Sequence, residues 1–116
     1  MDCVARFADE MWKCTGLRIE VVNDPREAVT PCNLIVTAGP MLKKPHVTIQ
    51  KDWMMPSAFA SPVDFDSSWH PDALRQADIY STDDTSQYVY YQKAGYFQNV
   101  PDFQKMSGGR YMWIAD

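Results

Sequence analysis

The chain has 116 residues, of which 46% are hydrophobic and 22% are charged, and its formal net charge is −4 at pH 7. This length provides for a single domain with its own core, and this composition excludes wholesale disorder. No run of 18 apolar residues occurs, and acidic residues near the start argue against a secretory signal peptide. We therefore expect one intracellular domain over residues 1–116, with no span across a membrane.

The cysteines point to the same compartment. Cys3, Cys14 and Cys32 are odd in number and form no CxxC pair, which argues against a disulfide framework. We expect three reduced, unligated thiols buried in the core.

The clearest regular element is a helix near the N-terminus. Its apolar residues recur at helical spacing and form one stripe: Val4, Phe7, Ala8, Met11 and Trp12. Asp2 suits the start of this helix and Gly16 its end. We expect Phe7 and Trp12 to anchor the helix in the core.

Several short segments have patterns typical of strands: 17–21, 33–38, 46–50, 88–91 and 111–115. A Gly-Pro break and the basic pair Lys43 and Lys44 separate the second segment from the third, which favours an antiparallel hairpin. Pro71 begins a pattern that predicts a second short helix near 71–80. The expected fold is therefore α+β, with the N-terminal helix packed on an antiparallel sheet of four to five strands.

Residues 51–70 follow neither period and form a long irregular arm that is rich in large apolar side chains. Pro56 and Pro62 favour extended backbone there. No single regular element can turn these side chains inward, so we expect the arm to bury against another polypeptide chain. Closure of the arm over the domain's own core is the alternative.

A second candidate contact surface is the Tyr-rich segment 88–97, whose aromatic residues would occupy both faces of a strand. Such a strand is typical of a protein interface or of burial between layers. A stacking platform for single-stranded nucleic acid would need a basic groove, and the 11 Lys and Arg are scattered. Nucleic acid is therefore not an expected partner. The predicted partner-binding residues are Trp53, Met54, Met55, Phe59, Phe65, Trp69, Tyr88, Tyr90 and Tyr91.

The densest polar cluster in the sequence is Asp64, Asp66, His70 and Asp72, whose oxygen and nitrogen ligands could share a metal ion. The spacing matches no EF-hand or zinc pattern, and helix capping with solvated carboxylates explains it equally well. Neither a nucleophile elbow nor a phosphate-binding loop is present. We expect no metal and no cofactor.

These observations predict a non-enzymatic protein–protein binding or assembly subunit, such as a homo-oligomer or a structural component of a viral or phage particle. Two alternatives remain open. The acidic stretch 64–84 could act as an intracellular inhibitor or decoy against the basic site of an enzyme or a nucleic-acid-binding protein. A small metal-dependent enzyme at Asp64, Asp66 and His70 is the other.

Overall fold

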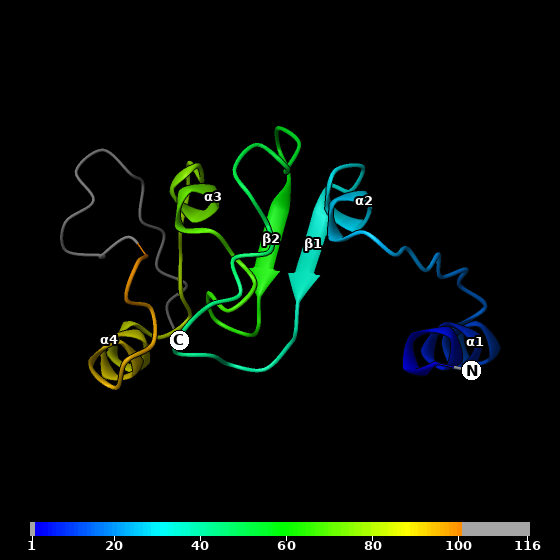
Figure 1. Cartoon of the computed structure of the whole chain (residues 1–116), viewed down its shortest axis with the longest axis horizontal. Helices are drawn as coiled ribbons and strands as arrows, with labels where there is room; N and C mark the ends of the chain where they lie inside the picture. Colours follow the sequence, from blue (N-terminus) through cyan, green and yellow to red (C-terminus); the bar gives the residue numbers. More distant parts are fainter. Residues whose placement is uncertain (1, 101–116) are drawn as a thin grey trace.

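The computed structural model describes residues 2–100, which form four helices and one sheet of two strands (Figure 1). The helices are α1 (Cys3–Thr15), α2 (Pro25–Val29), α3 (Pro71–Arg75) and α4 (Thr85–Lys93), and the strands are β1 (Leu34–Thr37) and β2 (Phe59–Pro62). The two strands run parallel, with Leu34 opposite Phe59 and Thr37 opposite Pro62.

This parallel pair corrects the expected antiparallel sheet of four to five strands. Segment 46–50 makes no hairpin with β1, because Ile49 pairs in parallel with Trp69 far along the chain. Segment 88–91 lies in α4, where the side chain of Asp84 accepts a bond from the backbone N–H of Gln87 and begins a helix despite the β-prone tyrosines. Segment 17–21 belongs to neither strand. The expected strand at 111–115 lies outside the described residues.

The second helix is shorter than expected. Pro71 stands at its first turn, as the sequence predicts, and His70 caps it. The helix ends at Arg75, so the remaining residues of the expected span 71–80 lie outside it.

The core lies on one side of the sheet. Its buried apolar residues come from α2, β1, α3, α4 and the segments between and after them: Val29, Ile35, Ile49, Trp69, Ala73, Leu74, Tyr88, Phe97 and Val100. Along β1 the alternation of a strand is clear, since Ile35 is buried while Leu34 and Val36 are exposed. One face of the sheet is therefore covered and the other is open.

The arm 51–70 is part of the folded body. Residues 59–62 of the arm form β2, while most of the arm lies outside the sheet. Trp53, Met54 and Phe65 pack against the core cluster. The alternative outcome, closure over the domain's own core, therefore describes this segment.

Helix α1 stands apart from the core. None of its residues is buried, and Phe7 and Trp12 are 53% and 55% exposed. Figure 1 shows the chain leaving α2 on the side of β1 opposite β2 and leading away to α1. The expected packing of this helix on the sheet, with Phe7 and Trp12 as anchors, is therefore wrong. Among residues 2–100, no helix has the length and apolarity needed to cross a bilayer.

Trp53 and Trp69 should differ in their contributions to stability. Trp69 is 1% exposed and its Nε1 donates to the Thr37 hydroxyl, whereas Trp53 is half-buried. Trp69→Phe should lower the free energy of unfolding by about 2–3 kcal/mol, and the matched Trp53→Phe by less than about 1 kcal/mol. Urea unfolding measures both. Equal losses would contradict the core assignment.

Candidate functional site

The buried turn after β2 is organised by a carboxylate. Asp64 is 1% exposed. Its Oδ1 accepts a hydrogen bond from the Thr37 hydroxyl at 2.6 Å, and its Oδ2 accepts from the Gly39 backbone N–H at 3.2 Å and from the Ser68 hydroxyl at 2.8 Å. The side chain therefore ties the end of β1 to the turn that follows β2.

The same network extends to the core tryptophan. The Thr37 hydroxyl, which donates to Asp64, also accepts from Trp69 Nε1 at 3.0 Å. A Cβ atom at Gly39 would lie 3.4 Å from Asp64 Oδ2, so the backbone approaches the carboxylate closely. With its donors satisfied in this way, Asp64 acts as a structural group.

Asp66 is buried beside this network, and one of its oxygens is unsatisfied. It is 4% exposed, and its Oδ1 has no hydrogen-bond partner within residues 2–100. Burial raises the pKa of Asp66 above its ordinary value of 3.8, and the charge of Asp64 adds to this effect. Hydrogen bonds to the backbone of Asp66 itself and of Phe97 act in the opposite direction.

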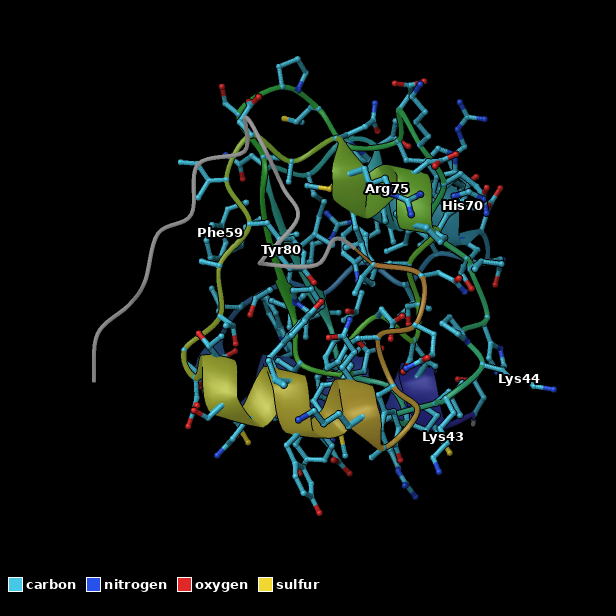
Figure 2. All side chains as sticks on the ribbon, turned by 90° about the vertical axis from the view of Figure 1, so that its left-hand side faces the viewer. Lys43, Lys44, Phe59, His70, Arg75 and Tyr80 are labelled. Carbon is cyan, nitrogen blue, oxygen red and sulfur yellow. The ribbon has the colours of Figure 1, made fainter. Side chains whose placement is uncertain are left out.

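His70 and Asp72 serve helix α3. His70 Nδ1 accepts from the backbone N–H of Asp72 at 3.1 Å, and Arg75 donates to Asp72 Oδ1 at 3.1 Å. Figure 2 shows His70 and Arg75 together on this helix. In the described part of the chain, no three His, Cys, Asp or Glu side chains are placed to share a metal ion. Asp64, Asp66 and His70 are therefore not brought together as a set of metal ligands.

The acidic stretch 64–84 presents less charge to solvent than its composition predicts. Asp64 and Asp66 are buried, and Asp84 caps α4. Asp72, Asp78 and Asp83 are exposed, and Asp72 pairs with Arg75 at 3.1 Å. The charge that a basic partner could meet on this stretch is therefore smaller than the sequence alone indicates.

The aromatic residues around Phe65 pack on one another. Phe65 has a left-handed backbone conformation, with φ of 63°, and its ring centroid lies 4.9 Å from that of Tyr91 and 4.6 Å from that of Phe97. Tyr88 stacks on Phe97 at 4.3 Å. This cluster joins α4 and residues 95–100 to the buried turn.

The nine predicted partner-binding residues therefore differ widely in exposure. Trp69 and Tyr88 are buried, and five are half-buried: Trp53, Met54, Met55, Phe65 and Tyr91. Phe59 and Tyr90 are 65% and 68% exposed. Of the nine, these two present the most surface to a partner.

One exposed apolar surface that the sequence did not predict is on the N-terminal arm, defined here as residues 2–22. Val4, Phe7 and Trp12 are each more than half exposed on one stripe of α1. Leu17 and Val21 continue the exposed apolar surface along the extended segment. Helical periodicity identified the stripe, but the stripe was assigned to the core.

A second open surface lies on the sheet. Leu34, Val36 and Phe59 are 61%, 59% and 65% exposed. The first two alternate with buried Ile35, and Phe59 is paired with Leu34 across the strands. In Figure 2, Phe59 lies at the margin of the molecule. We call these three residues the open sheet face.

Within residues 2–100, the outer edge of β1 has no strand partner. Strand β2 pairs with one side of β1, and no other strand of the described chain pairs with the opposite side. A groove of about 400 Å³ runs beside β1, with a wall formed by α2. The lining residues are Pro25, Ala28, Val29, Leu34, Ile35, Val36, Thr37, Thr48, Ile49 and Ser68.

The three cysteines are free but exposed, which corrects the expectation that they are buried. Cys3 and Cys14 lie in α1, which has no covering layer, and Cys32 lies in the connection between α2 and β1.

No protein-family model, curated protein or solved structure shows significant similarity to this chain. Its function must therefore be inferred from its own surfaces.

Removal of the Asp64 carboxylate should strongly destabilise the fold. In Asp64→Ala, the donors of Thr37, Gly39 and Ser68 lose their common acceptor, which should cost about 3–5 kcal/mol. The control Asp83→Ala removes an exposed carboxylate and should change stability by about 0.5 kcal/mol or less. Chemical denaturation compares the two. Similar small losses would contradict the structural role of Asp64.

Asp66 should make stability depend on pH. Because its pKa is raised in the folded state, the folded state holds the proton more tightly than the unfolded chain. Stability from this group is fully present below pH 3.8 and is lost as pH rises through the raised pKa. The asparagine side chain of Asp66→Asn is neutral at every pH. Above pH 3.8, the free energy of unfolding of this variant should therefore increase relative to that of the parent chain. Denaturation curves between pH 3 and 7 measure the difference, and a constant difference would contradict this account.

Proposed function

We propose that this chain is a non-enzymatic association subunit that contacts a protein partner through its N-terminal arm. The observation that carries this proposal is the apolar stripe of α1, which is exposed on a helix with no buried residue. Large exposed apolar patches mark interaction sites in proteins that otherwise bury such surface.

Helix α1 is well formed locally but lacks tertiary support. Asp2 Oδ1 accepts from the Ala5 N–H at 2.8 Å, and Gly16, with φ of 70°, closes the other end by donating to the Trp12 carbonyl at 2.9 Å. A helix shorter than about 12–15 residues is marginal in water, and helices in proteins gain most of their stability from a packed apolar face. A partner that covers the stripe would supply this support.

The aromatic side chains offer much of the free energy for such a contact. Full burial of one large apolar side chain contributes about 1.5–3 kcal/mol. Phe7 and Trp12 are both more than half exposed, so about half of that contribution remains available at each.

The charges of α1 indicate what kind of surface it meets. Lys13 pairs with Asp9 at 2.9 Å, and Arg6 lies 4.0 Å from Glu10. The charges on the polar face of α1 thus neutralise one another. The helix therefore has no excess charge with which to attract a charged partner, and its apolar stripe favours an apolar partner surface. This neutrality favours apolar docking over an electrostatic decoy, and such docking depends little on salt.

Oxidative labelling of Trp12 tests the proposal on the full chain in an extract of its native source. Hydroxyl radicals should oxidise Trp12 several-fold more slowly in the parent chain than in Phe7→Glu, because the introduced charge prevents the stripe from docking. Mass spectrometry reads the rate, with buried Trp69 as internal reference.

Glu10→Lys is the matched control, since it changes charge on the polar face of the same helix. It should protect Trp12 as the parent chain does. Equal oxidation of Trp12 in the parent chain and in Phe7→Glu would contradict the proposal.

A further inference from the structure

We propose that the partner is a second copy of this chain, and that two copies exchange their N-terminal arms. Each arm would cover the open sheet face of the other copy and lie along the free edge of its β1. This inference rests on the proposed function and specifies its partner.

The first reason is that the chain carries two apolar surfaces that complement each other. Parallel strands occur almost only where both faces of the sheet are covered. Here the face with Leu34, Val36 and Phe59 is open, and the amphipathic helix that could cover it stands elsewhere. Figure 1 shows α1 at a distance from the sheet. A second copy supplies the missing layer.

The second reason is the extended segment between α1 and α2. Leu17, Ile19 and Val21 alternate with Arg18 and Glu20, the period of a half-buried strand. The three apolar residues are 67%, 36% and 44% exposed, and the segment pairs with no strand within residues 2–100. A segment with the period of a strand but no strand partner could pair with the β1 edge that no described strand occupies, by edge addition.

The charges of α1 favour docking on an apolar protein surface and argue against binding to a lipid surface. The open sheet face contributes only Leu34, Val36 and Phe59, which carry no charge, and the polar face of α1 is internally neutral. Helices that lie on membranes usually carry Lys and Arg in excess on the polar face. In α1 the basic residues Arg6 and Lys13 are matched by acidic partners.

The dimensions also fit. A helix of this length is about 20 Å long, and an extended linker of residues 17–24 spans up to about 26 Å. Phe7, Trp12 and Phe59 together leave roughly 260–430 Å² of aromatic surface per chain, because each aromatic side chain can bury about 150–250 Å². The smallest stable interfaces bury about 1,200 Å², of which about 56–58% is apolar. Two copies reach that apolar area once their aliphatic residues are included.

Reciprocal exchange is closed by a twofold axis, so both arms and both acceptor faces are used once. No open filament follows, because each copy gives and receives one arm.

Sedimentation equilibrium of the full chain tests the proposal with two variants. Phe7→Glu places a negative charge on the arm, and Val36→Lys places a positive charge on the acceptor face; both positions are exposed, so the body should keep its fold. The parent chain should be a dimer, and each variant alone should be a monomer. An equimolar mixture of the two should recover a dimer, since one arm and one acceptor remain intact and the two introduced charges have opposite signs.

Two controls accompany these variants, and circular dichroism checks the fold of all of them. Glu10→Lys changes the polar face of α1, and Gln87→Lys changes an exposed residue of α4. Both should remain dimers.

Any other outcome would contradict the proposed exchange of N-terminal arms. A monomeric parent chain at high concentration would do so, whether its arm folds back onto its own sheet or binds vesicles of anionic phospholipid. A dimer that is broken by Phe7→Glu but not by Val36→Lys would show pairing between helices instead. A monomeric parent chain whose Trp12 is nevertheless protected in the native extract would leave the proposed function standing with a different partner.

Discussion

The rest of the structure depends on one buried carboxylate. Asp64 gathers the Thr37 hydroxyl, the Gly39 N–H and the Ser68 hydroxyl around its two oxygens. These donors come from the end of β1, the chain beyond it and the turn after β2, so one side chain brings together segments distant in sequence. A buried charge is tolerated only when it is hydrogen-bonded in this way. The bonds in turn hold Trp69, through Thr37, at the centre of the core.

This constraint also explains why the body has an open side. The turn at residues 64–69 directs Trp69 and Phe65 toward the same layer, where α3, α4 and the aromatic cluster assemble. The described elements after β2 contribute buried side chains to the cluster that also holds Ile35 of β1. Leu34, Val36 and Phe59 of the sheet are exposed, and the N-terminal arm is a second described segment with exposed apolar side chains.

The capping and helix-boundary signals in the sequence were reliable, while the strand patterns at 17–21 and 88–91 and the pairings between distant residues were not. The cap at Asp2, the glycine at residue 16 and the proline at residue 71 have the roles that their chemistry predicts. The hairpin prediction was wrong because Ile49 pairs with Trp69, and nothing within segment 46–50 encodes that choice. The role of Asp64 was not predictable, since its partner Thr37 lies 27 positions away in the chain. The stripe of α1 was found, but helical periodicity shows that a face will be buried and not which surface buries it.

The separation of arm and body has an energetic consequence. Phe7 and Trp12 share no contacts with the core, so the arm and the body should contribute to stability additively rather than through coupling. The proposed association would be coupled to the order of α1, because docking must fix a helix that is marginal by itself. Part of the contact free energy would then be spent on this ordering, and the affinity would be lower than the buried area alone suggests.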